Sequence, residues 1–247
     1  MDSRLNREAE FHNKTYESDS RDKLGKYYAI ARKSRDYYEN FLAQNCANKK
    51  VLEYGCGEGS YGYFLAKKGA SVSGIDISDF AIKEANEIAK KENLKIDFKV
   101  MNAEALEYKD NTFDLICGTG ILHHLDLDKA LEEIARTLTN NGKAIFIEPL
   151  GHNLFINIFR KLTPNLRTED EHPLKVDDIN NFKNIFGNVD LYYFHLFSLA
   201  AVPFHKANFF KGLLSFLDSI DATLFKLFPI LKKYAWMVVI VFSNPTE

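Results

Sequence analysis

The hydrophobic residues of this chain follow two spacings, one typical of strands and one typical of helices. Short apolar runs end at Glu53 and Asp76, and a segment with helical spacing follows each of them. The alternation continues to about residue 150. It predicts an α/β fold with a mostly parallel sheet and helices on both faces. The expected strands are Lys49–Glu53, Ser71–Asp76, Leu94–Val100, Thr112–Cys117, Lys143–Ile147, Asn188–Phe197 and Tyr234–Phe242.

The segments between the strands carry the helical spacing. Ser78 precedes one of them and is placed to cap it. The first 20 residues are polar, so we expect them to be loosely ordered, although Phe11 and Tyr16 could dock on the fold. Asn141 and Gly142 predict a turn before the fifth strand. The expected helices are Arg21–Asn45 (as one helix or two), Ser60–Lys68, Asp79–Glu92, Asp128–Leu138, 151–162, Val176–Phe186 and 206–228.

The apolar content of the last strand indicates where it lies in the sheet. Residues 234–242 are hydrophobic throughout. A strand that alternates with polar residues has one face in water, whereas a strand buried on both faces reads as a continuous apolar run. We therefore expect this strand in the centre of the sheet, away from its edges.

Composition narrows the class of protein. The 247 residues carry a formal net charge of -2, which argues against a nucleic-acid partner, because such proteins usually show a basic excess. The three cysteines, Cys46, Cys56 and Cys117, have no metal-ligand spacing and cannot all pair, as expected in a reducing compartment such as the cytoplasm. We expect no signal peptide, because the first ten residues are rich in charge and contain no apolar h-region. We expect no membrane span, because no uncharged apolar run reaches about 18 residues.

A candidate ligand-binding loop follows the first strand, where Glu53 precedes glycines at positions 55, 57 and 59. Such a loop between a strand and a helix fits a nucleotide-like ligand. The third glycine falls one place short of the dinucleotide pattern. A carboxylate at Glu53 would repel a pyrophosphate and attract a cation such as S-adenosylmethionine. Asp76 could accept both ribose hydroxyls of either ligand.

Later strand ends add candidate contacts to the same ligand. Asn102 could bond an adenine amino group, with a helix cap as the alternative reading, and Ala103 could offer its backbone N–H. Gly118 follows the fourth strand, where a small residue lets backbone carbonyls reach an ammonium group.

With these motifs the chain resembles the class I S-adenosylmethionine-dependent methyltransferases, in their small-molecule, type 11-like group. The resemblance covers roughly residues 20–150 by motif and the last strand by pattern. It implies a Rossmann-like sheet of seven strands whose last strand is antiparallel. Asn102 departs from the Asp that many relatives carry. The cofactor contacts implied are Glu53, Gly55, Gly57, Asp76, Ile77, Asn102, Ala103 and Gly118.

The resemblance also suggests how the chain divides. We expect a single methyltransferase domain with an N-terminal helical cap at 1–48 and a cofactor-binding core at 49–150. An acceptor-side lid and helical insertion would occupy 151–233, and the final strand 234–247.

Candidates for catalysis and for the methyl acceptor lie at the carboxyl ends of strands and in the later loops. His123 and His124 follow the fourth strand, and histidine has a suitable pKa for a general base. Relatives often carry a histidine there without using it as a base. No metal-ligand cluster is visible in the sequence, so no metal is expected. The candidate acceptor contacts are Tyr28, Glu148, His152, Arg167 and His172.

Three functions stay open at this stage. The first is methyl transfer to a small, apolar or lipid-like molecule, and the second is a nicotinamide-dependent dehydrogenase. The third is a cofactor-binding module without catalysis. Gly118-Thr119-Gly120-Ile121 stands where methyltransferases of nucleic-acid amino groups have a proline-containing box, which again excludes nucleic acid.

The phenylalanine-rich segment 206–233 allows several interpretations. Its apolar positions are more numerous than one core-facing stripe requires, and lysines flank them. The segment could pack under a lid, form an apolar acceptor tunnel, support a homodimer or contact a membrane surface peripherally.

Overall fold

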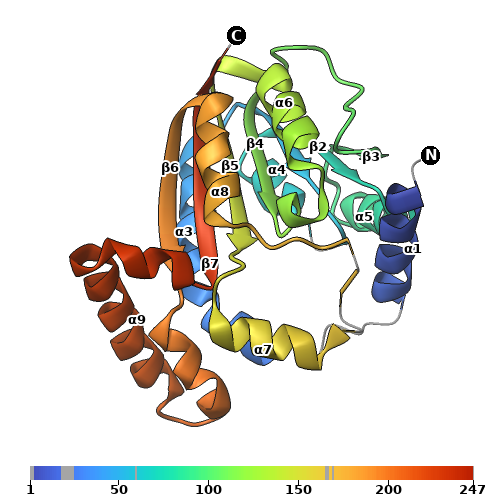
Figure 1. The fold of residues 1–247 in the computed structure, drawn as a ribbon. Helices are drawn as coiled ribbons and strands as arrows, with labels where there is room; N and C mark the ends of the chain where they lie inside the picture. Colours follow the sequence, from blue (N-terminus) through green and yellow to red (C-terminus); the bar gives the residue numbers. More distant parts are fainter. Residues whose placement is uncertain (1–2, 18–24, 59, 165–166, 169, 247) are drawn as a thin grey trace.

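The computed structural model describes residues 3–17, 25–58, 60–164, 167–168 and 170–246. Its centre is one sheet of seven strands in the order β3-β2-β1-β4-β5-β7-β6. Every neighbouring pair is parallel except the two pairs that β7 makes, which confirms the predicted fold class (Figure 1). The strands are β1 (Lys50–Tyr54), β2 (Ser71–Asp76), β3 (Ile96–Val100), β4 (Phe113–Thr119), β5 (Leu138–Pro149), β6 (Phe186–Phe194) and β7 (Met237–Pro245).

The position of β7 confirms the prediction from its apolar sequence. It lies between β5 and β6 and pairs with both. Val238 and Ile240 belong to the core on one face of the sheet, whereas Val239 and Val241 belong to the core on the other. Alternate residues of the strand are thus buried on opposite faces, so each position of the buried run 238–242 needs an apolar side chain.

Helices cover both faces of the sheet. Tyr38 and Leu42 of α3 and Leu65 of α4 pack into one core, and Leu131 and Ile134 of α6 pack into the opposite one. The apolar spacing predicted most of these helices within a few residues. The α-helices are α1 (Ser3–Glu17), α2 (Gly25–Ile30), α3 (Arg32–Asn45), α4 (Gly62–Lys67), α5 (Asp79–Lys91), α6 (Leu127–Thr137), α7 (Leu154–Leu162), α8 (Val176–Asn181) and α9 (Phe210–Leu227).

Two local expectations were wrong. Residues 3–17 form α1, a regular helix; residues 18–24, part of the first expected helix, lie outside the described residues. Hydrophobic spacing did not reveal α1 because Glu8, a charged residue, is buried on its inner side. Asn141 and Gly142 also lie within β5, where the pairing with β4 shifts register, so the expected turn is an irregularity inside a strand.

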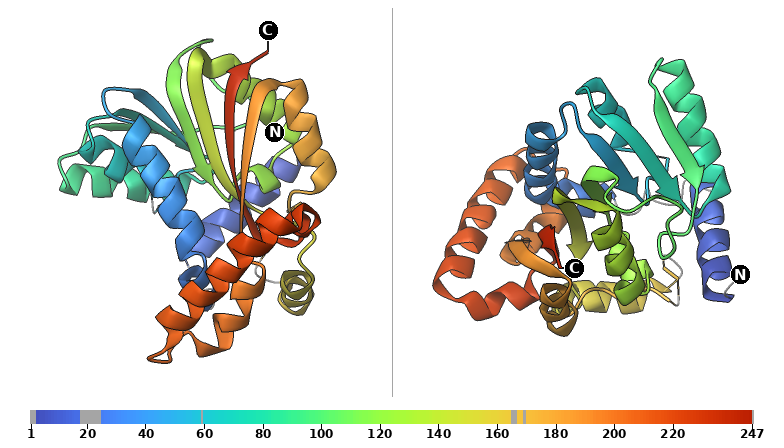
Figure 2. Two further views of the ribbon diagram at one scale, coloured as in Figure 1. Left: turned by 90° about the vertical axis from the view of Figure 1, so that its left-hand side faces the viewer. Right: turned by 90° about the horizontal axis from the view of Figure 1, so that it is seen from above.

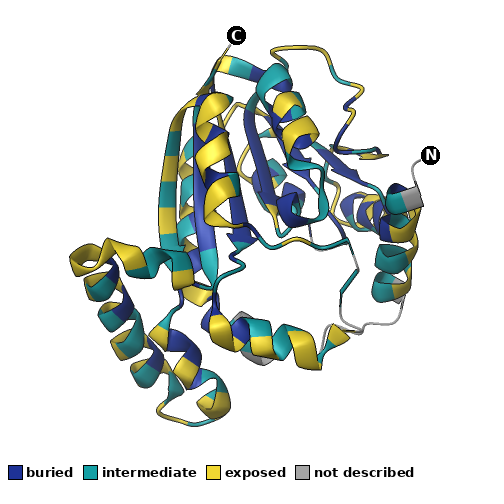
Figure 3. Ribbon diagram, viewed as in Figure 1, coloured by how far each residue is buried: buried dark blue, intermediate teal, exposed yellow. Residues whose placement is uncertain are grey.

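The helical insertion before the last strand is confirmed, and it has three parts. They are the 3₁₀ helix η5 (Phe197–Phe204), the helix α9 and the 3₁₀ helix η6 (Pro229–Tyr234). Figures 1 and 2 show α9 extending beyond the sheet, on the side away from α1. Much of its surface and that of α7 is exposed (Figure 3). None of the described helices combines the length and apolarity that crossing a membrane would require.

Candidate functional site

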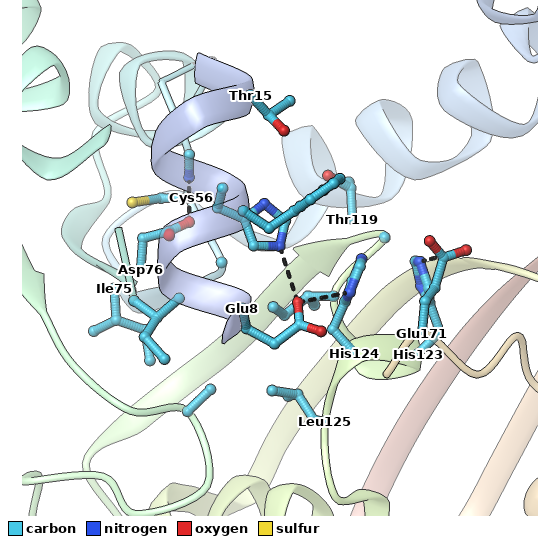
Figure 4. Close-up of a pocket in the computed structure, with 18 of the residues that line it drawn as sticks. Glu8, Thr15, Cys56, Ile75, Asp76, Thr119, His123, His124, Leu125 and Glu171 are labelled. Atoms are coloured by element: carbon cyan, nitrogen blue, oxygen red, sulfur yellow. Dashed lines mark hydrogen bonds and ion pairs between the residues drawn. The ribbon is translucent and has the colours of Figure 1, made fainter. Parts of the chain in front are cut away.

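A cavity of about 740 Å³ lies at the carboxyl ends of the central strands. The loops after β1, β2, β3 and β4 form one wall, and α1 lies across it (Figure 4). This edge is where open α/β sheets bind their ligands, and the volume is that of an ordinary small-molecule site.

The glycine loop after β1 has a backbone that other residues would strain. Gly55 and Gly57 have φ angles of +69° and +50° and both line the cavity. A Cβ atom on Gly57 would lie 2.7 Å from the hydroxyl of Tyr16 on α1. The loop therefore needs glycine twice, for its left-handed conformation and for the close approach of α1. Gly59 lies outside the described residues.

Glu53 lies behind this loop, which corrects the interpretation that it faces a cationic ligand. Its carboxylate accepts hydrogen bonds from the Ser60 hydroxyl and from the backbone N–H groups of Tyr61 (2.7 Å) and Gly62 (2.8 Å). It is buried and does not line the cavity. Burial raises the pKa of Glu53 to about 7, although the three donors lower it. Its place in the structure is to fix the loop to the start of α4.

Asp76, at the end of β2, lines the cavity as predicted, and so does Ile77. Each carboxylate oxygen of Asp76 accepts one backbone N–H, from Gly57 at 2.8 Å and from Ser78 at 2.9 Å. A carboxylate has about four lone-pair sites in total. Asp76 thus keeps capacity for further hydrogen-bond donors from a ligand.

The rest of this wall consists of residues that follow β3 and β4. Asn102 and Ala103 line it, and the Asn102 side-chain oxygen also accepts the Glu104 N–H at 3.0 Å. Asn102 therefore stabilises the turn after β3, independently of any contact with a ligand. Gly118 is buried behind the wall, where a Cβ would lie 2.7 Å from the Phe146 ring. Thr119 and Gly120 line the cavity instead, so direct ligand contact at Gly118 is not supported.

His123 and Glu148 form a buried pair beside the cavity. The His123 Nδ1 atom lies 2.7 Å from Glu148 Oε2, and Glu148 Oε1 accepts the backbone N–H groups of Ile121 and Leu122, both at 2.9 Å. Burial and the neighbouring His124 lower the pKa of His123, and Glu148 opposes them. His123 lines the cavity whereas Glu148 does not, so Glu148 orients the histidine and is not the acceptor contact expected from sequence.

His124 faces α1 across the cavity. Its Nδ1 atom lies 3.2 Å from Glu8 Oε2, and His12 Nε2 lies 3.4 Å from the same oxygen. Although burial would raise the pKa of Glu8, the two imidazoles help to hold it below its usual range. Figure 4 shows Glu8 and His124 directed toward each other. This cluster was not predicted from the sequence, because His124 is more than 100 positions from Glu8 and His12.

Comparison with known proteins identifies the family. The sequence model of the family described as "Methyltransferase domain" matches residues 45–189, which is more than half of the chain. The chain belongs to the class I S-adenosylmethionine-dependent methyltransferases. A ubiquinone biosynthesis O-methyltransferase of Pelagibacter ubique (strain HTCC1062) is 40% identical to the methyltransferase over 113 residues, which is 45% of this chain and 46% of the relative. The chain thus matches about half the length of such relatives.

Solved structures support the same fold. Phosphoethanolamine N-methyltransferase 2 of Haemonchus contortus, in complex with phosphomonomethylethanolamine and S-adenosylhomocysteine, has a TM-score of 0.59 and 20% identity. The similarity covers 81% of the methyltransferase and 50% of that chain. The PH0226 protein of Pyrococcus horikoshii OT3 has a TM-score of 0.55 and 20% identity, covering 87% and 91%.

The cavity of the methyltransferase fits the family's cofactor. A glycine loop that tolerates no Cβ and a carboxylate with spare acceptor sites lie side by side in it. These are the groups that hold the ribose of a nucleoside ligand in such sheets. The individual cofactor contacts stay predictions, and Gly55, Gly57, Asp76, Ile77, Asn102 and Ala103 are the ones that line the cavity.

Three of the expected acceptor residues are not part of the cavity lining of the methyltransferase, although the backbone N–H of His172 donates to the carbonyl of His123, which is. His172 is exposed, His152 accepts the Val176 N–H, and Arg167 donates to the backbone of the segment after α7. None of the three lines the cavity. Tyr28 lies in α2, but its side chain is outside the described part of the structure.

Several lining residues were missed from the sequence. Glu171, in the loop after α7, lies near His123 and is paired with Arg160. On α1, Arg4 forms an ion pair with Glu104 and donates to the His124 carbonyl. The sequence had indicated α1 only through the expected helical cap at 1–48 and the possible docking of Phe11 and Tyr16, both of which line the cavity.

Proposed function

We propose that the protein transfers the methyl group of S-adenosylmethionine to an oxygen atom of a small, apolar or lipid-like acceptor. The observation that carries this proposal is His123, which lines the cavity while Glu148 holds its Nδ1 atom at 2.7 Å. An oxygen acceptor benefits from a base in this position. The relatives that match this chain over about half of their length are named O-methyltransferases, which agrees with an oxygen acceptor.

The glycine loop and Asp76 would hold the cofactor. Gly55 and Gly57 let its backbone lie close to the loop, and Asp76 would accept its ribose hydroxyls. Asn102 and Ala103 would border its adenine. The cofactor supplies an electrophilic methyl group, and the protein aligns it and excludes water.

The hydrogen bonds of Glu148 define the protonation of His123. The Glu148 carboxylate is bound by two backbone N–H groups, so it can only accept from Nδ1. His123 then carries its proton on Nδ1 and presents the lone pair of Nε2. We propose that Nε2 takes the proton of the acceptor hydroxyl as the new oxygen–carbon bond forms. Such a base contributes roughly 10²–10⁴-fold to a rate.

The apolar side of the cavity supports an apolar acceptor. Ile147, Pro149, Trp236 and Met237 line it, where β5 and β7 meet. These side chains offer mainly apolar contact area, and such surfaces favour hydrophobic ligands.

We further propose that α7, α9 and η6 contact a membrane surface, from which a lipid-like acceptor would enter. Phe155 is 71% exposed, Phe216 64% and Ile230 67%. Exposed apolar side chains with nearby cations suit an anionic bilayer surface. The lysines of this region are Lys206, Lys211, Lys226, Lys232 and Lys233.

Vesicle flotation tests the membrane contact. We expect the protein to float with vesicles that contain phosphatidylglycerol, and Phe216→Ser to reduce the bound fraction. If the same apolar surface joins two copies of the chain instead, wild type will not float and light scattering will give the mass of a dimer.

Methyl transfer itself is tested with isotopically labelled S-adenosylmethionine and an organic extract of cells. The proposal predicts label in the organic phase with wild type and a loss of about 100-fold or more with His123→Gln. Tight cofactor binding without any labelled product would favour a non-catalytic module. Hydride transfer from a nicotinamide cofactor would support the dehydrogenase function in place of methyl transfer.

A further inference from the structure

Two histidines and one glutamate from distant parts of the chain converge in the cavity. Glu8 and His12 are one turn apart on α1, and His124 belongs to the 3₁₀ helix η2 (Leu122–His124) after β4. One ligand atom from each of the three lies within 4.8 Å of the other two. The rings of His12 and His124 are 5.1 Å apart and meet edge to face.

The cluster is buried but not satisfied by hydrogen bonds. Glu8 is 4% exposed. Among the described residues, neither of its carboxylate oxygens has a hydrogen-bond partner of good geometry, and the same holds for Nδ1 of His124. The two imidazoles lie 3.4 and 3.2 Å from the same Glu8 oxygen without a well-formed hydrogen bond, so the ligand atoms of all three side chains remain able to coordinate. Such a site calls for a cation that all three groups can share.

A neighbouring set of groups is already occupied by protein contacts. His123, His124 and Glu171 also come close together. However, Glu171 is paired with Arg160, and His123 Nδ1 is bound by Glu148. The unsatisfied atoms therefore belong to the cluster on α1.

We propose that Glu8, His12 and His124 bind a divalent first-row transition-metal ion. Two imidazole nitrogens and one carboxylate oxygen on one side of an ion suit Fe²⁺, Mn²⁺, Co²⁺ or Zn²⁺, and they leave coordination positions open. Mg²⁺ and Ca²⁺ prefer sites built from oxygen alone. The spacing of Glu8 and His12, four positions apart on a helix, places both side chains on the same face.

The open positions would face the rest of the cavity. Resting on the proposed function, we assign to the ion the binding of the acceptor oxygen, next to His123. A coordinated hydroxyl loses its proton more readily, because the ion stabilises the anion. The ion would also tie α1 to η2, so it would stabilise the helix over the site.

Cobalt is a direct probe, because its visible absorption reports the ligands. The protein is treated with a chelator, equilibrated with Co²⁺ and passed through a desalting column. We expect wild type to retain about one equivalent and to show absorption bands of a histidine-ligated ion. His12→Gln and Glu8→Gln should weaken Co²⁺ binding by more than the roughly 10–100-fold caused by losing an outer partner of a ligand. His205→Gln, directly after η5 and not part of the cavity lining, should bind as wild type does.

Two outcomes would overturn the proposal. Wild type that retains no Co²⁺ rejects it whatever the variants do. Equal retention by wild type and His12→Gln rejects the assigned ligands. Titration with S-adenosylhomocysteine is run on every sample: cofactor binding without metal binding removes this inference alone, whereas absence of cofactor binding in wild type removes the proposed function.

Discussion

Replacement of Asp76 by asparagine tests how the cavity holds its nucleoside ligand. Asp76 gives one lone-pair site on each oxygen to a backbone N–H, of Gly57 at 2.8 Å and of Ser78 at 2.9 Å. Two of about four sites then remain for the two ribose hydroxyls. In Asp76→Asn one oxygen becomes an NH₂ group, which cannot accept and faces backbone N–H donors.

The magnitude follows from counting bonds. One charge-assisted hydrogen bond to a ribose hydroxyl is lost, worth about 1.5–3 kcal/mol, and the other becomes a neutral bond weaker by about 1 kcal/mol. The sum is about 2.5–4 kcal/mol, which corresponds to a Kd raised by roughly 70- to 850-fold.

Calorimetric titration with S-adenosylhomocysteine measures this change. The matched control is Asp79→Asn, an exposed carboxylate three positions later that undergoes the same change of charge. Thermal unfolding of both variants shows that the fold is kept. A Kd for Asp76→Asn within threefold of wild type would refute the assignment of Asp76 to the ribose.

Three further predictions use other parts of the structure. Glu148→Gln should lower the rate of methyl transfer without changing the affinity for S-adenosylhomocysteine. The double variant with His123→Gln should be only slightly slower than His123→Gln alone, because the two side chains act as a unit. Additive losses of rate would contradict this. Gly57→Ala should weaken cofactor binding in the same titration, because φ is +50° and its Cβ would meet Tyr16, whereas Gly212→Ala, in open space on α9, should raise the free energy of unfolding by up to about 1 kcal/mol. Burial lowers the pKa of His195 to about 3, so the stability it confers is complete above its unfolded pKa and is lost as the pH falls below about 6.5. Between pH 6.5 and 4.5 the His195→Gln variant should lose about 2.3 kcal/mol less than wild type in urea unfolding.

The surroundings of His195 explain why it stays neutral. Ser34 donates its hydroxyl proton to the Ala31 carbonyl, so its oxygen accepts from His195 Nε2 at 2.9 Å. Nδ1 of His195 faces the Ser198 hydroxyl at 3.3 Å and Asp218 at 3.8 Å. Burial raises the pKa of Asp218 to about 6, which adds stability in acid and opposes His195. Comparison of variant with wild type separates the two effects.

The parts of the fold that sequence predicted are those encoded locally. The apolar runs of the strands, the glycine loop and Asp76 each lie in a short segment. Their structure can be predicted from the spacing or the chemistry of a few neighbouring residues. The last strand was predicted to be central because both of its faces are apolar. The antiparallel orientation came from the family resemblance.

The parts that sequence missed depend on distant contacts. Glu53 was interpreted as a ligand contact, because its position at a strand end is visible but its hydrogen bonds to the start of α4 are not. Glu148 was interpreted as an acceptor contact for the same reason. The inner side of α1 is polar, since Glu8 meets His124 there, so its spacing does not resemble a core helix. The expected division of the chain into cap, core and lid stays a prediction.

A structure of the complex with S-adenosylhomocysteine would show directly whether the cavity is the cofactor site. We predict that the ligand lies in the cavity, with its ribose hydroxyls within hydrogen-bond distance of the Asp76 carboxylate. Its sulfur should point toward His123 Nε2, with room for an acceptor between them. A ligand bound elsewhere, or bound with its sulfur turned away from His123, would contradict the account.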